Sequence, residues 1–157
     1  MNNNEIIVMK SVDAGVEAVW SALTDVERLA DVFESVVAVE KLTPGQLSVG
    51  TEWRETYRWL SFELASTVRV ARIEDGRVLE IRSNSAGTDL AMEYRLEPRE
   101  SETLVRMRFW AENHTWLARL IWLVNGPVVM QASRKNLPAK ADELAGYVER
   151  VSGDSSL

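Results

Sequence analysis

Five consecutive segments between residues 51 and 113 alternate apolar and polar side chains with a period of two. Such alternation places every second side chain on the same face of a β-strand. Turn signals separate most of these segments, at Asp75-Gly76, at residues 85–87 and at residues 98–101. Strands joined by short turns pair antiparallel. The run therefore predicts an antiparallel sheet, with strands at about 51–60, 62–73, 77–84, 88–97 and 102–113.

The residues before this run predict two more strands with helices between them. Residues 5–12 are rich in β-branched side chains and residues 35–42 alternate, so both are expected as strands. Asp13 is the expected N-cap of a helix over about 14–23. Thr24 or Asp25 is expected to cap a second short helix, which ends near residue 31. The apolar face of the first helix consists of Val16, Val19, Trp20 and Leu23.

The residues after the run predict a long C-terminal helix. Thr115 can cap a helix that begins at Trp116. Gly126-Pro127 is expected to interrupt it and Pro138 to kink it. Because such a helix must bury its apolar stripe on the sheet, the fold class is α+β. The stripe consists of Leu137, Ala141, Leu144, Ala145, Val148 and Val151.

Length and charge limit what the chain can bind. A chain of 157 residues fits one domain, expected over residues 1–151, with 152–157 as a frayed polar tail. With 18 basic and 24 acidic residues the net charge is −6, which disfavours nucleic-acid partners. The longest stretch without charge, residues 120–133, is too short to span a membrane, so no stable membrane insertion is expected. The N-terminus lacks the pattern of a signal peptide, so a cytoplasmic location is expected.

Cysteine and histidine limit the chemistry. The chain has no cysteine, which excludes disulfides, thiolate nucleophiles and cysteine-based metal sites. The one histidine, His114, lies on the outward phase at the end of the last strand, where a solvated position is expected. No nucleotide or metal motif is present, so we expect no metal site, and any chemistry would be cofactor-free.

Three stretches resemble one family. Residues 12–25, with Val19-Trp20 followed by Leu23-Thr24-Asp25, are similar to the opening strand-to-helix signature of the polyketide cyclase/dehydrase and lipid-transport branch of the START-like superfamily. Residues 49–55 resemble its strand opener, and residues 134–144 resemble the end of its long helix. Gly15 stands where that family usually has proline.

The resemblance implies a helix-grip fold. A curved antiparallel seven-stranded sheet would wrap around the long C-terminal helix, with two short helices between the first and second strands. It also implies a ligand cavity on the concave face of the sheet, and we expect a volume of roughly 300 Å³ or more for a drug-sized molecule.

The alternation indicates which side chains face that cavity. The strand at 51–60 is the most informative, because Trp53, Tyr57 and Trp59 are too apolar to face water together and so place Glu55 inward as well. A buried carboxylate is costly unless it is paired or protonated. Helical spacing allows Arg134 to reach it. The expected ligand-binding residues are Trp53, Glu55, Tyr57, Ser66, Val68, Ile81, Ser83, Met92, Tyr94, Met107, Phe109, Asn113, Arg134 and Leu137.

Several functions fit this pattern. The first is binding of a hydrophobic small molecule, such as a lipid, a polyketide or an isoprenoid. The second is a cofactor-free polyketide cyclase or dehydratase that uses Glu55, Tyr57 or Tyr94 as acid or base. The third is a lipid extractor in which residues 120–129 form a gate that meets lipid. Trp110 lies on the outward phase, and if exposed it would indicate a homodimer face. The sequence leaves open whether the protein is an enzyme.

Overall fold

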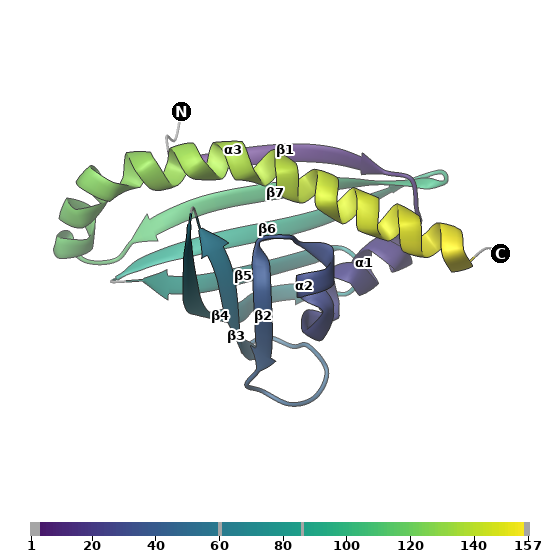
Figure 1. Cartoon of the computed structure of the whole chain (residues 1–157), viewed down its shortest axis with the longest axis horizontal. Coiled ribbons are helices and arrows are strands. Elements are labelled where there is room, and N and C mark those ends of the chain that lie inside the picture. Colours follow the sequence, from purple (N-terminus) through teal and green to yellow (C-terminus); the bar gives the residue numbers. More distant parts are fainter. Residues whose placement is uncertain (1–3, 60, 86, 156–157) are drawn as a thin grey trace.

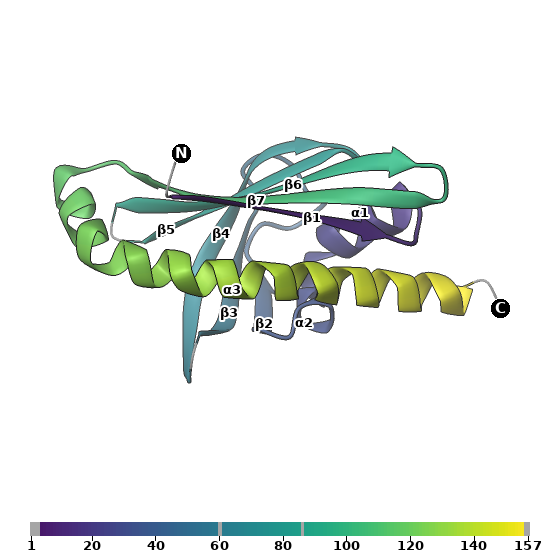
Figure 2. The same ribbon diagram turned by 90° about the horizontal axis from the view of Figure 1, so that it is seen from above.

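The structure, a computed structural model, describes residues 4–59, 61–85 and 87–155 (Figure 1). One antiparallel sheet of seven strands carries a long helix, α3, on its concave side, as Figures 1 and 2 show. This confirms the expected α+β helix-grip architecture. The elements are β1 (Glu5–Val12), α1 (Val16–Thr24), a 3-10 turn (Val26–Arg28), α2 (Leu29–Val32), β2 (Val36–Lys41), β3 (Glu52–Trp59), β4 (Phe62–Glu74), β5 (Val78–Ser85), β6 (Thr88–Arg99), β7 (Glu102–Asn113) and α3 (Trp116–Ser155).

The strand order is β1-β7-β6-β5-β4-β3-β2, so the first strand pairs with the last. Two register shifts, between Val36 and Ala38 and between Val70 and Arg72, interrupt the pairing of β2 with β3 and of β4 with β5. Extra residues of this kind bend a strand and increase its twist. As a result β2 and β3 run across the direction of β6 and β7 (Figure 1), which gives the sheet its concave face.

The turns between strands follow the sequence signals. Gly76 and Gly87 have φ of 71° and 84°, a conformation that glycine adopts without strain. Of the expected turn and strand ends, Leu60 and Ala86 lie outside the described residues. Phe62 and Leu64 have the expected inward phase but are exposed, because the hairpin of β3 and β4 reaches past α3 (Figure 2).

The expected N-cap at Asp13 is wrong, whereas Asp25 does take the N-cap position of the 3-10 turn. α1 begins at Val16 with Gly15 as its N-cap, and the backbone N–H of Asp13 instead donates to Glu149 at 3.0 Å. The Thr24 hydroxyl donates to the Trp20 carbonyl, and Asp25 makes no side-chain cap bond. Neither the Thr24 nor the Asp25 side chain therefore accepts a backbone N–H at the start of the second helical segment.

α3 begins as expected but is not interrupted. The Thr115 hydroxyl accepts the Ala118 N–H at 3.0 Å, which confirms it as the cap. The expected break at Gly126-Pro127 is wrong, because the helix continues through Pro127 and Pro138 and through most of the expected tail to Ser155. Its N-terminal end curves instead (Figure 1), and bending is one way to accommodate proline. A Cβ at position 126 would lie 2.6 Å from the Trp122 indole nitrogen, so glycine lets Trp122 fold back over the helix.

The core lies between the concave face and the C-terminal half of α3. Its sheet residues include Trp53, Val70 and Met107, and α1 adds Val19 and Leu23. The helix contributes Leu137, Ala141, Leu144, Ala145 and Val148, which are the members of the predicted stripe apart from the exposed Val151. Polar contacts among the described residues join this half of α3 to other elements: Lys10 pairs with Asp142 at 2.9 Å, and the backbone N–H groups of Asp13 and Glu34 donate to Glu149 and Glu143.

On the convex face, a network of ion pairs surrounds Trp110. The indole has the expected outward phase but is only 7% exposed, so Trp110 is not the exposed tryptophan that would have indicated a homodimer face. The guanidinium carbons of Arg108 and Arg82 lie 4.3 and 5.7 Å from its ring centre. Its N–H donates to Glu112 at 3.0 Å. Cross-strand charge pairing thus covers an aromatic side chain that would otherwise face water.

Within the described part of the chain, no helix combines the length and the apolar character needed to cross a bilayer.

Candidate functional site

A small cavity lies between the concave face, the α1–α2 region and α3. Four of the expected site residues line it: Trp53, Glu55, Ile81 and Tyr94. The alternation of β3 is therefore confirmed, because Glu55 and the buried Trp53 share this inner surface. Most of the remaining lining is apolar and comes from Leu23, Leu29, Phe33, Val36 and Leu79.

The cavity is much smaller than expected. Its volume is about 30 Å³, against the roughly 300 Å³ of a typical small-molecule pocket. A space of this size holds about one or two water molecules. The physical reason is that large side chains fill the concave face, above all the buried Phe33, Trp53 and Tyr94. A drug-sized ligand would enter only if some of these side chains moved.

Glu55 is the acidic group of this cavity. The side chain is half-buried, and its Oε2 accepts the indole N–H of Trp53 at 3.1 Å. The two residues lie two positions apart on β3, so both point to the same face. A buried indole donor thus fixes one carboxylate oxygen in position.

The negative charge of Glu55 affects the pKa of two tyrosines, Tyr57 and Tyr94. Burial, and then the negative charge of Glu55, raise the pKa of Tyr94 far above its usual value. The same two causes, in the same order, raise the pKa of Tyr57. Both phenols therefore stay protonated at neutral pH. In any acid–base chemistry here, the tyrosines would be proton or hydrogen-bond donors and Glu55 the acceptor.

The cationic group of the cavity is Lys140, which the sequence analysis missed. It lines the cavity from α3, and its Nζ lies 5.1 Å from the centre of the Phe33 ring. Lys140 follows Leu137 by three positions and precedes Leu144 by four, so helical spacing places it beside the buried stripe. That spacing could have indicated it. Arg134, which was expected to reach Glu55, is exposed on α3 and does not line the cavity.

The other expected site residues lie elsewhere on the concave side. The hydroxyls of Ser66 and Ser83 bond to each other across β4 and β5. Asn113 accepts the Thr88 hydroxyl at 2.6 Å at the far end of β6 and β7. Val68, Met107 and Leu137 are buried in the core, and Tyr57, Met92 and Phe109 are half-buried. The side chain of Trp59 lies outside the described residues.

A second, larger depression of about 190 Å³ shares no lining residue with the Glu55 cavity. It lies where Trp20 and Thr24 of α1 meet Lys41, Gln46 and other residues near the β2–β3 loop. It is more open and more polar than the Glu55 cavity. We therefore place the candidate site at the smaller cavity, which combines apolar walls with converging polar groups.

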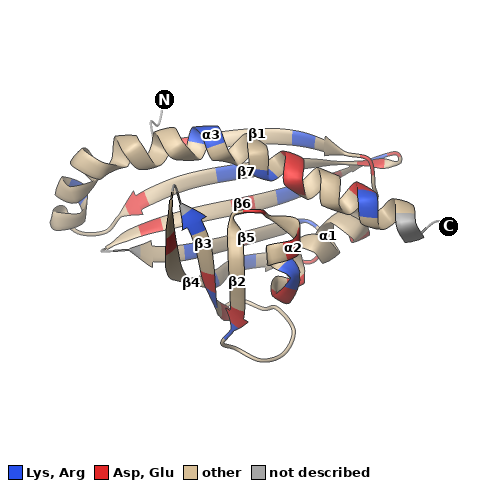
Figure 3. Cartoon of the chain, in the orientation of Figure 1, with Lys and Arg blue, Asp and Glu red and all other residues tan. Residues whose placement is uncertain are grey.

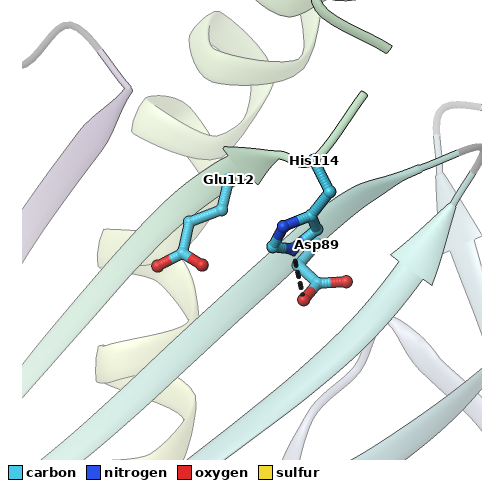
Figure 4. A group of neighbouring side chains, drawn as sticks. All are labelled: Asp89, Glu112 and His114. Atoms are coloured by element: carbon cyan, nitrogen blue, oxygen red, sulfur yellow. Dashed lines mark hydrogen bonds and ion pairs between the residues drawn. The ribbon is translucent and has the colours of Figure 1, made fainter. Parts of the chain in front are cut away.

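Three side chains on the convex face could in principle hold a metal ion. Asp89, Glu112 and His114 bring ligand atoms within 4.8 Å of one another (Figure 4). However, Arg82 already donates to Glu112 at 2.9 Å and lies 3.7 Å from Asp89. The Nε2 atom of His114 forms a hydrogen bond with Asp89 at 2.9 Å. The side chain is exposed, as expected from its phase. The guanidinium thus already supplies the positive charge that these carboxylates require.

Comparisons with known proteins agree with this architecture. The model of a family described as polyketide cyclase/dehydrase and lipid transport matches residues 6–149. No curated protein matches the sequence.

Solved structures share the fold at low identity. A START superfamily protein from Mycobacterium smegmatis is 16% identical, with a TM-score of 0.77 over 94% of this chain and 99% of the other. The Zhui aromatase/cyclase from Streptomyces sp. R1128 is 20% identical, with a TM-score of 0.72 over 93% of each chain. The protein TTHA0849 from Thermus thermophilus is 15% identical, with a TM-score of 0.74 over 94% of this chain and 99% of the other.

Proposed function

Because the chain belongs to the polyketide cyclase/dehydrase and lipid transport family, we propose that it binds a hydrophobic small molecule between the concave sheet face and α3. The observation that carries this proposal is the set of polar groups in the apolar cavity. Glu55, Tyr94 and Lys140 come from β3, β6 and α3 and converge on one space. A few such groups on apolar walls are typical of sites that orient a small molecule.

The polar groups narrow the ligand class. Glu55 accepts a hydrogen bond, the Tyr94 phenol can donate one, and the Lys140 ammonium donates to an oxygen acceptor. A pure hydrocarbon would leave these groups without partners, at a cost. The ligand that fits is therefore mostly apolar and carries hydroxyl and carbonyl oxygens, as polyketides do. Because the cavity holds only about 30 Å³, binding would displace side chains around Phe33.

Binding can be measured with an apolar fluorescent probe. We expect saturable binding in the micromolar range, about −8 kcal/mol. Glu55→Gln keeps the shape of the side chain and an oxygen that can accept the Trp53 N–H, but it removes the charge. We expect it to leave the thermal midpoint nearly unchanged and to alter the affinity for hydroxylated probes. Glu63→Gln, an exposed carboxylate on β4, is the matched control. If no probe binds saturably, the proposal is wrong.

The second candidate is cofactor-free cyclisation or dehydration of a polyketone. The observation that favours it is the pairing of a carboxylate with phenols that stay protonated. Glu55 would accept a proton from a carbon between two carbonyl groups, and Tyr94 would donate a hydrogen bond to the enolate oxygen that forms. The enolate carbon would then attack another carbonyl carbon of the same chain, which the cavity holds close, and the alkoxide that forms would take the proton back from Glu55.

Turnover distinguishes the two candidates. A cyclase converts a polyketone, and both Glu55→Gln and Tyr94→Phe slow the conversion by about 100-fold or more, the usual contribution of one acid–base group. A carrier binds the polyketone without converting it. Native mass spectrometry of protein purified from its own host would identify a co-purifying ligand in either case.

A further inference from the structure

The first turns of α3 expose a continuous apolar surface. Its members are between 41% and 76% exposed: Trp116, Leu117, Leu120, Ile121, Leu123, Val124 and Val128. We refer to these seven side chains as the α3 apolar face. Scattered single apolar residues are normal on a protein surface, but a contiguous group of this size marks an interaction site.

The geometry of the helix places these residues side by side. At about 100° per residue they cover an arc of roughly 160°, with Leu120 and Val124 near its middle. Ala118 and Met130, which are buried, lie outside this arc, and Gly126 lies outside it beneath the Trp122 indole. The α3 apolar face therefore points away from the core and does not line the Glu55 cavity.

Charge separates the partners that this surface could take. Between residues 116 and 133 the only charged residue is Arg119, and Figure 3 shows the N-terminal part of α3 almost without charge. The whole chain carries a net charge of −6. Interfacial helices that bind membranes usually carry several Lys and Arg residues on their polar face, which attract anionic lipid. This helix has one, on an acidic protein.

We propose that the α3 apolar face binds the same face of a second copy of this chain. The seven side chains, each 41% to 76% exposed, present an apolar surface of several hundred Å², the same order as the roughly 800 Å² per partner of a standard interface. Because the face is uncharged, a symmetric contact brings no acidic groups of the two chains together at its centre. In an isologous dimer the two α3 helices cross near the two-fold axis, with Leu120 and Val124 of each copy in contact.

The first test is the association state. Sedimentation velocity of the full chain at 1–100 µM concentrations (about the range in which interfaces of modest size assemble) should show a monomer–dimer equilibrium. Val124→Glu places two like charges near the axis and should weaken the dimer roughly 30-fold or more, the effect of losing a central contact. Val49→Glu is the matched control, because Val49 is similarly exposed but lies in the β2–β3 loop. It should leave the dimer unchanged.

The second test uses the symmetry of the contact. Val124→Lys alone should also dissociate the dimer, and an equimolar mixture of Val124→Lys and Val124→Glu should associate again as a heterodimer. Circular dichroism should show the same thermal midpoint for all variants under monomeric conditions, because Val124 is 75% exposed in the single chain. Only pairing of position 124 across two copies predicts this recovery.

Three results would overturn the proposal. The first is a wild-type protein that is still monomeric at about 100 µM, the highest concentration of the first test, because an interface of this size should assemble there. The second is a dimer that Val124→Glu does not weaken. The third is a monomer that binds phosphatidylcholine vesicles through Leu120 and Val124, which would assign the face to lipid. The Glu55 cavity shares no residue with this face, so probe binding can persist or fail independently of all three.

Discussion

At the scale of single residues, Tyr94 shows how the cavity assigns chemical roles. The phenol is buried on β6 and faces the same space as Glu55. Burial and the nearby negative charge both oppose its ionisation, and the pKa of Tyr94 rises for that reason. The residue can therefore donate a hydrogen bond over a wide pH range, but it cannot act as a phenolate base near neutrality.

This raised pKa predicts alkaline destabilisation. In the unfolded chain tyrosine loses its proton near pH 10, whereas folded Tyr94 keeps it. The stabilisation is therefore complete below about pH 10 and is lost as pH rises from there toward the folded pKa, by up to about 1.4 kcal/mol per pH unit. Urea unfolding between about pH 8 and pH 11 should show this slope, and Tyr94→Phe should reduce it. Part of the slope should remain in Tyr94→Phe, because the pKa of Tyr57 is raised as well. Equal slopes in the two proteins would contradict the assignment.

Sequence reasoning found some of these residues and missed others. Strand alternation was enough to place Glu55, Trp53, Ile81 and Tyr94 inward, because a period of two assigns a face without knowledge of side-chain packing. Strand alternation says nothing of residues outside the strands, such as Phe33 and Lys140. For Lys140 the available signal was its helical spacing from Leu137 and Leu144. Arg134 is exposed and does not line the cavity, because a helical row does not fix which strand lies opposite it.

At the scale of elements, α3 has two unlike halves. Its C-terminal half buries Leu137, Leu144 and Val148 and makes polar contacts to β1 and to the segments flanking α1 and α2. Its N-terminal half is held by the Thr115 cap and by a bond of 3.3 Å from the Trp122 indole to Asn4, while most of its large side chains face outward. The stabilising contacts of the helix are therefore concentrated beyond residue 137.

Two leucine truncations should separate these halves. Leu144→Ala removes a side chain that is 1% exposed and should lower the free energy of unfolding by about 2–5 kcal/mol. Leu123→Ala removes one that is 74% exposed and should change it by less than about 0.5 kcal/mol in the monomer. Urea titration monitored by circular dichroism measures both. Similar losses for the two variants would show that the N-terminal half packs more tightly than described.

The elements themselves were largely predictable. Turn signals such as Asp75-Gly76 and the change of period after residue 113 were local, and all seven strands formed close to their expected ranges. The expected break at Gly126-Pro127 was wrong because proline removes one backbone donor and can be accommodated by bending. The folding of Trp122 over Gly126 also needs a glycine there, for a reason unrelated to a helix end.

At the scale of the whole molecule, the two faces of the sheet are covered in different ways. The concave face packs apolar side chains against α3, and the convex face carries a network of charges around Trp110. The volume left between sheet and helix was not predictable from the sequence, because it depends on the rotamers of Phe33, Trp53 and Tyr94 together. The convex phase of Trp110 and of Arg108, two positions before it on β7, was predictable, but the approach of Arg82 required the register of β5, β6 and β7.

The convex network predicts a loss of stability in acid. Hydrogen bonds from Trp110 and then from Arg82 lower the pKa of Glu112. Burial opposes the same change at Asp89, but hydrogen bonds from Asn84 and His114 outweigh it, with Arg82 adding to them. Because both folded pKa values lie below the unfolded ones, this stabilisation is present above about pH 4.5 and is lost as pH falls further.

Arg82→Gln should flatten that acid response. The effect should be below about 1 kcal/mol, since the groups are partly exposed and solvent screens them. Thermal melts at pH 3 to pH 7, about the range over which these carboxylates titrate, measure it. Arg99→Gln, whose partner Glu97 is well exposed, is the control and should behave like the wild type. An unchanged response in Arg82→Gln would place the acid sensitivity in other carboxylates.

The unequal packing of α3 also has a consequence in time. Backbone amides exchange with deuterated water only when their hydrogen bonds open, and opening is easiest where few side chains resist it. In a single chain, the amides of the turns between Trp116 and Val128 would exchange through local openings, whereas those around Leu144 would wait for much larger unfolding events. One unbroken helix would thus contain both fast and slow amides. Its N-terminal turns could unwind and re-form many times while the rest of the fold stays intact.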